Sequence, residues 1–323
     1  MAQNVKEMGH IGVLMGGPSS EREISLKSGQ AVLLALQEEG CHVSPIFIDT
    51  DDEKALLSQL QQAAIDVAFL ALHGRFGEDG TIQAILDKAN IIYTGSGVEA
   101  SQRAFNKVVC QQLFQQNHIR VSRYAALRKN SGNPAKALAA LKLPVFVKPS
   151  CEGSSIGISY AASKAELEAA LALAWQYGEE VLVEEAIEGT EVTVGILDQA
   201  PLPIVEICPK NKFFDFKAKY EKGMTEYIVP ARLSQEAAKA VQETALKAYK
   251  LLGCRHLARV DFMVDRKGQH YLLEVNTIPG FTATSLLPKA AKHAGINFNQ
   301  LCLKLVGLAY GEKKKFTHLP SGR

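Results

Sequence analysis

Several features that would mark whole classes of protein are missing from this sequence. No segment approaches the ~18 consecutive apolar residues of a membrane-spanning helix. Residues 1–10 lack the continuous apolar stretch of an export signal. The six cysteines are scattered singly, with no CxxC pair and no spacing typical of a zinc site or a disulfide framework. We therefore expect a protein of the reducing cytoplasm that does not bind a membrane.

An excess of charge of one sign is also missing. The 323 residues include 36 Lys and Arg against 34 Asp and Glu, a net charge of +2, and only the tail at residues 313–323 is distinctly basic. Nucleic acid is therefore not an expected partner. A hydrophobic content of 47% supports buried cores. The chain is longer than the roughly 250–300 residues at which single cores usually split, which predicts two or three domains.

The usual nucleotide-binding fingerprints are absent or incomplete. No Walker A sequence, GxxxxGK[ST], occurs anywhere in the chain. Residues 95–100 match the looser dinucleotide pattern GxGxxG/A, but residues 115–118, about 20 positions further on, lack the acidic residue that binds the ribose. A structural turn is therefore favoured over NAD binding at this segment, and any nucleotide site must use another architecture.

The order of apolar and amphipathic segments predicts an α/β protein, α+β overall, in three parts. Residues 1–102 alternate short apolar segments with amphipathic ones, which is typical of an open parallel α/β sheet. Residues 103–188 are expected to form a small α+β unit, which begins inside a Gln-rich helix at residues 98–117, and residues 189–323 form the third part. The expected elements of the first part are strands at 11–15, 43–48, 67–72 and 91–94 and helices at 25–39, 53–63 and 81–89.

Two segments rich in apolar and β-branched residues, 257–264 and 270–275, flank a turn and predict a β-hairpin. Because side chains two positions apart share one face of a strand, Glu274 and Asn276 point the same way. Pairing about the turn places Asp261 nearly opposite Glu274, so that two carboxylates and an amide oxygen share one patch. Such a patch requires a positive group among the carboxylates. Its oxygen ligands suit Mg²⁺ carried with substrate phosphates better than zinc.

A Gly- and Ser-rich loop at residues 148–157 is expected between two strands, at 143–147 and 156–158. Its backbone N–H groups and hydroxyls can face an anion, and Lys148 at the strand end adds a positive charge. The loop fits a phosphate site, although an ordinary hairpin loop explains the same composition. A second basic and aromatic segment, residues 212–230, fits either a lid over an anionic substrate or a solvated surface loop.

Two polar loops follow strands of the predicted parallel sheet. In the first, Ser20 and Glu23 have the spacing of a helix capping box, which leaves Glu21 without a structural role. The second contains His73, which on its own also fits an ordinary loop residue. Because ligands bind at the carboxyl edge of open α/β sheets, both loops should converge on one crevice. Residues 280–288, after the hairpin, fit either N–H donors to an oxyanion or a helix-capping turn.

Taken in order along the chain, these motifs resemble those of the ATP-grasp superfamily and, within it, of the D-alanine–D-alanine ligase family. The resemblance extends from residue 16 to about residue 309 and rests on several loops that agree in order, at residues 16–23, 72–80, 93–97, 148–157, 219–220, 259–261, 274–276 and 280–286. It implies a three-domain ligase in which ATP phosphorylates the carboxylate of a first D-alanine. The amine of a second D-alanine then attacks the acylphosphate to give D-alanyl-D-alanine for peptidoglycan precursors, with ADP and phosphate.

The resemblance also implies roles at the nucleotide end of the site. Asp261, Glu274 and Asn276 correspond to ligands of two Mg²⁺ ions, for which Mn²⁺ can substitute, and these ions neutralise charge during phosphoryl transfer. Lys107 and Lys148 are similar to the lysines that bind the α and β phosphates. The other residues implied to contact ATP are Ser155, Glu184, Glu185, Ile187, Glu191 and Lys219.

Two amino-acid subsites are implied by the same resemblance. Glu21 resembles the carboxylate that binds the ammonium group of the first D-alanine, and His73 belongs beside that subsite. Ser285 and Leu286 are similar to residues that bind the carboxylate of the attacking D-alanine. Substrate recognition is therefore expected to draw on both ends of the chain.

The implied catalytic residues surround the reacting carboxylate. Arg259 is similar to the arginine that grips the acylphosphate and the tetrahedral intermediate, helped by the Gly280 N–H, and a guanidinium suits this role because it forks onto two oxygens. Glu21, Ser154 and Tyr220 resemble a hydrogen-bonded set that closes the lid and helps to deprotonate the amine. Lid closure matters because an acylphosphate exposed to water hydrolyses.

A few positions bear on the choice of product. Relatives that make the D-alanyl-D-lactate ester commonly carry another residue at the position of Tyr220, so the tyrosine favours the dipeptide. Glu185 and Ala186 replace a Lys-Trp pair found in some relatives, which leaves the adenine contacts open there. The alternatives are a ligase with another second substrate, such as D-lactate or D-serine, and a nucleotide-binding regulator without turnover. The family also implies a homodimer.

Overall fold

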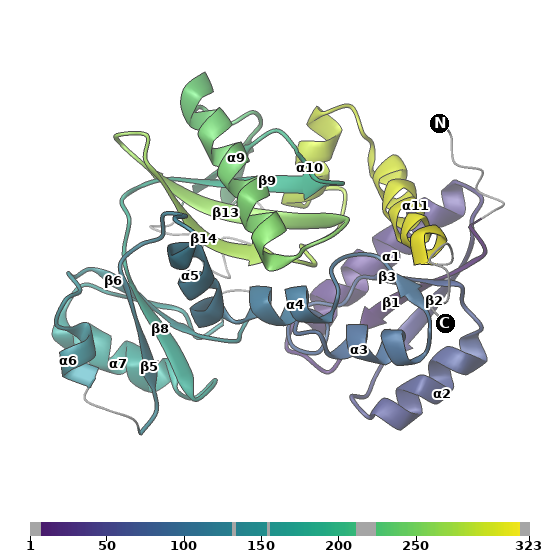
Figure 1. Ribbon diagram of the computed structural model, residues 1–323, viewed down its shortest axis with the longest axis horizontal. Coiled ribbons are helices and arrows are strands. Elements are labelled where there is room, and N and C mark those ends of the chain that lie inside the picture. The colour runs from purple at the N-terminus through teal and green to yellow at the C-terminus, as the bar shows by residue number, and fades with distance from the viewer. Residues whose placement is uncertain (1–7, 131–133, 154–155, 211–223, 317–323) are drawn as a thin grey trace, which may run out of the picture.

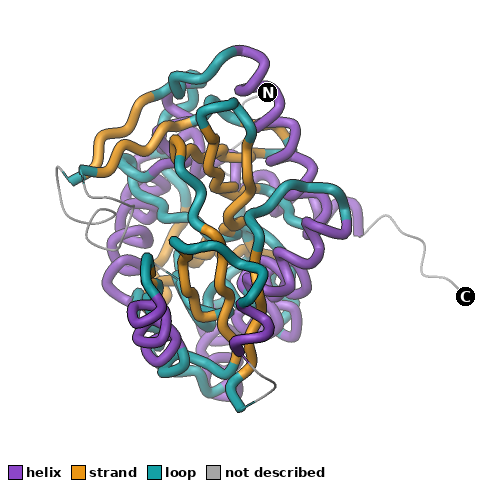
Figure 2. Tube along the Cα trace, turned by 90° about the vertical axis from the view of Figure 1, so that its left-hand side faces the viewer, coloured by secondary structure: helices purple, strands orange, loops and turns teal. Residues whose placement is uncertain are grey.

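The computed structural model describes residues 8–130, 134–153, 156–210 and 224–316. They form three β-sheets with helices packed around them (Figure 1). A view turned by 90° shows helices on both sides of the strands (Figure 2). The first sheet is parallel and the other two are antiparallel. The predicted α/β class, with an open parallel sheet at the amino-terminal end, is therefore confirmed.

The amino-terminal sheet contains four parallel strands in the order β2-β1-β3-β4. Its central strands are buried on both faces, which explains why they read as continuous apolar runs. Each predicted element of this part is present within a few residues of its expected bounds. The elements are β1 (His10–Gly16), α1 (Arg22–Glu38), β2 (His42–Ile48), α2 (Glu53–Ala63), β3 (Val67–Leu70), α3 (Thr81–Lys88) and β4 (Ile92–Tyr93).

Two helix starts differ from the prediction. The Gln-rich helix is two helices, α4 (Val98–Phe105) and α5 (Lys107–Gln116), because the side chain of Asn106 accepts a hydrogen bond from the Val109 N–H and starts a new helix. The expected Ser20 capping box is wrong. Helix α1 has Glu21 as its N-cap residue and no side-chain cap bond, so Glu21 itself lies at the helix start.

The middle sheet is antiparallel, with the strand order β5-β8-β6-β7. The predicted strand at 156–158 is wrong, since the strand there begins at residue 159. Strand β5 was not predicted. Helix α7 begins with a complete capping box between Ser163 and Glu166. The elements are β5 (Tyr124–Arg128), α6 (Pro134–Leu138), β6 (Val145–Pro149), β7 (Ser159–Ala161), α7 (Lys164–Ala174) and β8 (Glu180–Glu185).

The third sheet carries the predicted hairpin. Its strand order is β12-β11-β9-β13-β14, with β10 beside β9, and α9 crosses one face of β13 and β14 (Figure 1). Asp261 pairs directly with Glu274, as predicted. The elements are β9 (Gly189–Leu197), β10 (Ala200–Pro201), β11 (Val205–Pro209), β12 (Thr225–Ile228), α9 (Gln235–Leu252), β13 (Leu257–Asp265), β14 (His270–Asn276), α10 (Leu286–His293) and α11 (Phe298–Phe316).

The first and last parts of the chain share one apolar core. Helix α11 packs against α1, and Leu301, Leu305 and Val306 join the core that contains Val32 and Leu36. The three sheets fall within the predicted divisions, but the domain boundaries themselves stay a prediction. All six cysteines are free thiols. Within the described part of the chain, every helix is too short or too polar to span a lipid bilayer.

Candidate active site

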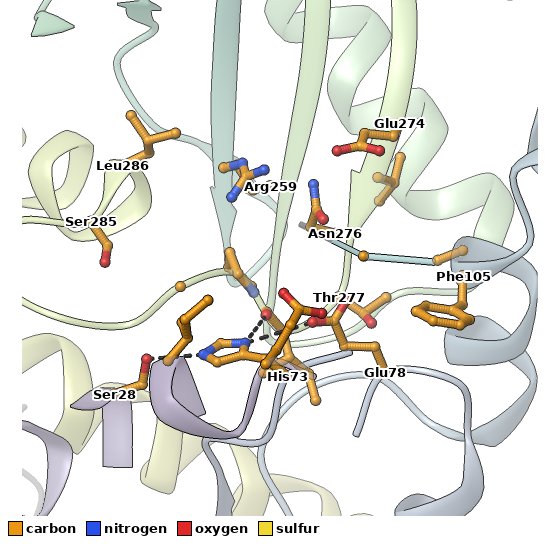
Figure 3. Close-up of a pocket in the computed structure, with 18 of the residues that line it drawn as sticks. Ser28, His73, Glu78, Phe105, Arg259, Glu274, Asn276, Thr277, Ser285 and Leu286 are labelled. Carbon is orange, nitrogen blue, oxygen red and sulfur yellow. Dashed lines mark hydrogen bonds and ion pairs between the residues drawn. The ribbon is translucent and has the colours of Figure 1, made fainter. Parts of the chain in front are cut away.

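A cavity of about 680 Å³ lies where the parallel strands end and the hairpin begins to close. Its walls come from the start of α1, the loop after β3, the start of α5, the hairpin strands and the start of α10. Figure 3 shows Glu274, Asn276 and Arg259 on one side of the cavity, His73 and Ser28 at its base, and Ser285 and Leu286 opposite. The predicted site residues that line it are Glu21, His73, Lys107, Arg259, Glu274, Asn276, Gly280, Ser285 and Leu286.

The hairpin places Arg259, Asp261, Glu274 and Asn276 on one face, since Arg259 pairs with Asn276 and Asp261 with Glu274. Asp261 is buried. Its Oδ1 accepts from Arg259 Nε at 2.9 Å and from Thr193 Oγ1 at 2.5 Å. Its Oδ2 accepts from Arg259 Nη2 at 2.7 Å and from Asn276 Nδ2 at 3.2 Å. The expected positive group is therefore present, because the Arg259 guanidinium compensates the buried carboxylate.

The hairpin face has the donor chemistry of a magnesium site. Asp261, Glu274 and Asn276 supply carboxylate and amide oxygens, the ligands that Mg²⁺ prefers. The bidentate guanidinium on Asp261 shows that this face already attracts positive charge. Within the described ranges, no three His, Cys, Asp or Glu side chains gather as a metal site. Only two carboxylates belong to the predicted set, so substrate phosphates would complete the coordination.

Lys148 and Glu184 form a buried ion pair on the middle sheet, across neighbouring strands β6 and β8. Burial alone would lower the pKa of Lys148, but Glu184, Glu274 and Glu191 together raise it above its ordinary value. Lys148 therefore stays protonated in a place where water is largely excluded. It can offer a fixed positive charge to a phosphate near the hairpin face.

The loop after β6 is tied to both neighbouring parts of the chain. Lys107 Nζ donates to the Glu152 carbonyl at 2.5 Å, and Arg75 Nε donates to the Glu152 carboxylate at 2.8 Å. Burial raises the pKa of the Cys151 thiol, so this cysteine is protonated and not an activated nucleophile. The predicted residues Ser154 and Ser155 lie outside the described residues, as do Lys219 and Tyr220.

Glu21 lies between the loop after β3, which carries His73, and the Gly- and Ser-rich loop after β6. Its side chain is buried, and its Oε2 lies 2.4 Å from the point that a Cβ on Gly74 or on Gly153 would occupy. Only glycine at these two positions lets the carboxylate approach both backbones. Glu21 thereby contacts the loop that carries His73 and the Gly- and Ser-rich loop together.

His73 is fixed by both ring nitrogens. Nδ1 lies 3.1 Å from the Ile278 carbonyl and 3.6 Å from Glu78 Oε1, while Nε2 lies 2.9 Å from Ser28 Oγ (Figure 3). Because a carbonyl only accepts, Nδ1 carries a proton and donates to the Ile278 carbonyl, while Nε2 is hydrogen-bonded to the Ser28 hydroxyl. His73 therefore joins the amino-terminal part of the chain to the segment after β14 and lines the cavity.

The start of α10 forms the far side of the cavity. Ser285 is its N-cap residue, and Ser285 Oγ lies 2.9 Å from Thr282 Oγ1 and accepts from the Thr282 N–H at 3.1 Å. A Cβ on Gly280 would lie 3.5 Å from Ser285 Oγ, so the two residues are close. The backbone N–H groups at Leu286 and beyond begin a helix. A carboxylate is favoured at such an end.

The remaining predicted residues lie at the end of β8, in the β8–β9 connection and near the start of β9. Glu185 is the last residue of β8, and its side chain accepts from the Lys142 N–H at 2.8 Å, away from the Lys148 ion pair. Ile187 is half-buried in the connection, and Glu191 on β9 is near enough to Lys148 to raise its pKa. Residues that the sequence reasoning missed are Ser28, Glu78, Gln111 and Thr193, of which only Glu78 stood inside a motif that it singled out.

Comparison with known proteins identifies the family of this chain. The family model described as D-ala D-ala ligase C-terminus matches residues 113–307, and the one described as D-ala D-ala ligase N-terminus matches residues 10–63 and 52–96. The chain belongs to the D-alanine–D-alanine ligase family. A D-alanine–D-alanine ligase of Geotalea uraniireducens is 48% identical over 301 residues, which cover 93% of this chain and 95% of the relative. One of Geobacter sulfurreducens is 46% identical over 298 residues, 92% of each chain.

The chain is also similar in fold to solved structures of a D-alanine–D-alanine ligase. A ligase of Bacillus anthracis, crystallised in complex with ATP, is similar with a TM-score of 0.85 and 32% identity. The match covers 95% of this chain and 99% of the other. The predicted ATP-grasp architecture is confirmed by this likeness.

Proposed function

We propose that this chain is an ATP-dependent ligase that joins two D-alanines through a D-alanyl phosphate, for the synthesis of peptidoglycan precursors. The observation that carries the proposal is the position of Arg259 in the cavity. It lies between the oxygen-rich hairpin face and the amino-acid side formed by Ser285 and Leu286, with His73 at the base (Figure 3). A carboxylate held beside this guanidinium would face phosphate donors on one side and an attacking amine on the other.

The nucleotide would occupy the side next to the middle sheet. Lys107 and Lys148 would bind its phosphates, and the protonated state of Lys148 supports that role. When bound, two Mg²⁺ ions, or Mn²⁺ in their place, would neutralise phosphate charge, held by Asp261, Glu274 and Asn276. The residues proposed around ATP are Ser155, Glu184, Glu185, Ile187, Glu191 and Lys219.

The amino acids would occupy the other side. The buried Glu21 carboxylate is proposed to bind the ammonium group of the first D-alanine, in the space shaped by His73. The second D-alanine would place its carboxylate at the start of α10, near Ser285 and Leu286. Arg259 and the Gly280 N–H would hold the acylphosphate oxygens while the amine attacks.

The proposal also includes roles for residues outside the described ranges. Ser154 and Tyr220 are proposed to form, with Glu21, the hydrogen-bonded set that closes over the site. The three-domain division at residues 1–102, 103–188 and 189–323, the homodimer and the cytoplasmic location stay predictions. Light scattering of the purified protein tests the homodimer directly.

The decisive experiment follows ADP and the condensed product separately. The purified protein is given Mg-ATP with D-alanine, L-alanine, D-serine or D-lactate, and each product is identified by mass spectrometry. We expect ADP and D-alanyl-D-alanine in equal amounts with D-alanine alone. If D-alanine is supplied together with D-serine or D-lactate and the main product joins the two different compounds, the second substrate is not D-alanine. ATP binding without any product would indicate a regulator.

A further inference from the structure

Gln111 is a buried amide between β8 and β14, beside the side of the cavity proposed to bind the nucleotide. It lies on α5, only 1% exposed. Its Nε2 donates to Glu184 Oε1 at 2.8 Å and to the Leu273 carbonyl at 3.2 Å. Both partners only accept hydrogen bonds, so the amide must present its NH₂ group to them. Its two N–H donors therefore join two elements that are distant in sequence.

The first partner, Glu184, uses both of its oxygens. Oε1 accepts from Gln111, and Oε2 forms the ion pair with Lys148. The Gln111 donor fixes the rotation of this carboxylate, which would otherwise turn about its last bond. The direction in which Lys148 points is therefore set partly by Gln111.

The second partner, Leu273, lies at an irregularity of the hairpin. Asp261 pairs with Glu274 and Phe262 pairs with Leu272, so that Leu273 has no partner on β13. Such a bulge residue leaves the ladder locally disrupted and redirects its neighbours. The bond from Gln111 holds the bulge immediately before Glu274. The direction of that proposed metal ligand thus also depends on Gln111.

Helix α5 presents a second site residue on the same face. Lys107 lies four positions before Gln111, and residues four apart share one side of a helix. One short helix therefore directs Lys107 toward the Gly- and Ser-rich loop and Gln111 toward Glu184.

We propose that Gln111 is a positioning residue that fixes the orientation of the Glu184–Lys148 pair relative to Glu274. The affinity for the nucleotide and the affinity for magnesium would then both depend on Gln111. This inference rests on the proposed function. Gln111 itself touches neither substrate. Its loss should weaken both affinities while the amino-acid subsites, on the other side of Arg259, remain unchanged.

The test replaces Gln111 by methionine, an unbranched side chain of similar reach without N–H donors. Gln112 on the same helix is exposed, so Gln112→Met is a matched control. Calorimetry with ADP requires no turnover, and we expect about tenfold weaker ADP binding by Gln111→Met, the scale of one lost hydrogen bond to a charged group. The Mg²⁺ concentration for half-maximal rate should rise, while the KM for D-alanine stays within about twofold of wild type.

A double-mutant cycle separates positioning from general damage. In the Glu184→Gln background, Gln111→Met should weaken ADP binding much less than it does in wild type. The reason is that Gln111 is proposed to affect ADP binding through its hydrogen bond to Glu184. Equal losses in both backgrounds, or wild-type ADP binding by Gln111→Met, would overturn the inference. If the methionine variant does not fold, Gln111→Asn replaces it, since one methylene fewer prevents the amide from reaching both partners. A wild-type protein that binds ADP but makes no dipeptide refutes the proposed function and leaves the ADP comparison as the test of Gln111.

Discussion

Arg259 holds both carboxylate oxygens of Asp261, with Nε 2.9 Å from Oδ1 and Nη2 2.7 Å from Oδ2. Both side chains are largely buried. The residue proposed to grip the acylphosphate and a residue proposed to hold the metal are thus bound to each other. Because the two side chains share these hydrogen bonds, a change at Asp261 would also alter the position of the Arg259 guanidinium.

Arg259→Lys should lower kcat about 100-fold, the usual scale for loss of a group that stabilises developing negative charge. Lysine keeps the charge but cannot fork onto two oxygens. ADP affinity, measured by calorimetry, should change little because the guanidinium is not proposed to contact the nucleotide. A kcat close to that of wild type would show that this arginine serves only as the partner of Asp261.

Glu274→Gln and Asp261→Asn should both abolish turnover at limiting Mg²⁺, but they should differ in stability. Asp261 accepts from Arg259, Thr193 and Asn276, so an amide there turns a donor toward other donors and should lower the free energy of unfolding by about 1–3 kcal/mol. Glu274 is only half-buried, and its amide variant should lose less. Urea unfolding monitored by circular dichroism makes the comparison. Equal stability losses would contradict the central position of Asp261 in the network.

Ser28→Ala should raise the KM for D-alanine several-fold. It removes the hydrogen bond between Ser28 Oγ and His73 Nε2 and the acceptor of the Phe281 N–H, which together should cost about 1–2 kcal/mol of unfolding free energy. Ser25→Ala is the matched control, because Ser25 lies one turn earlier on α1 and also makes two hydrogen bonds, both to backbone groups and neither to His73. We expect similar stability losses in both variants and a KM effect only in Ser28→Ala. Identical KM values in the two variants would show that His73 does not contribute to binding of the first D-alanine.

The buried Glu206 makes stability depend on pH. Hydrogen bonds from the Arg232 side chain hold the pKa of Glu206 below its ordinary value of 4.5, against the opposing effect of burial. A lowered folded-state pKa means that the stabilisation is complete above pH 4.5 and is lost as the pH falls through the lower value. Glu206→Gln should therefore be less stable than wild type at pH 7, and the difference should shrink by pH 3. Urea unfolding at both pH values checks this.

An exposed ion pair provides the control for that experiment. Glu188 and Arg266 form a salt bridge in which both side chains are 82% exposed. Glu188→Gln should leave the free energy of unfolding nearly unchanged at either pH, because exposed pairs contribute little. A loss as large as that of Glu206→Gln would mean that burial is not what makes Glu206 important.

Sequence alone predicted the local parts of the site well. The period of two along a strand and the short turn after β13 were enough to place Asp261 opposite Glu274. The strands of the parallel sheet were also predictable, because strands buried on both faces are apolar throughout. The edge strand β5, with the sequence YAALR and only Leu127 buried, has no such pattern and was missed.

The contacts that hold the site together could not be predicted in the same way. Thr193 lies 68 residues from Asp261, and Gln111 lies 73 residues from Glu184. Such contacts depend on how separate sheets and helices pack, which a local pattern does not record. The roles of the individual site residues likewise stay predictions until the variants are measured.

The packing of α11 on α1 has a consequence for how the protein is made. One face of the parallel sheet is covered by α1 together with apolar side chains of residues 301–309. During synthesis on the ribosome, the part of that face that α11 covers remains open to solvent until residues 301–309 have emerged. The Tyr310 hydroxyl then donates to the Met8 carbonyl at 2.5 Å and ties the two ends together. The parallel sheet of residues 10–93 thus completes its core only after both other sheets have been translated.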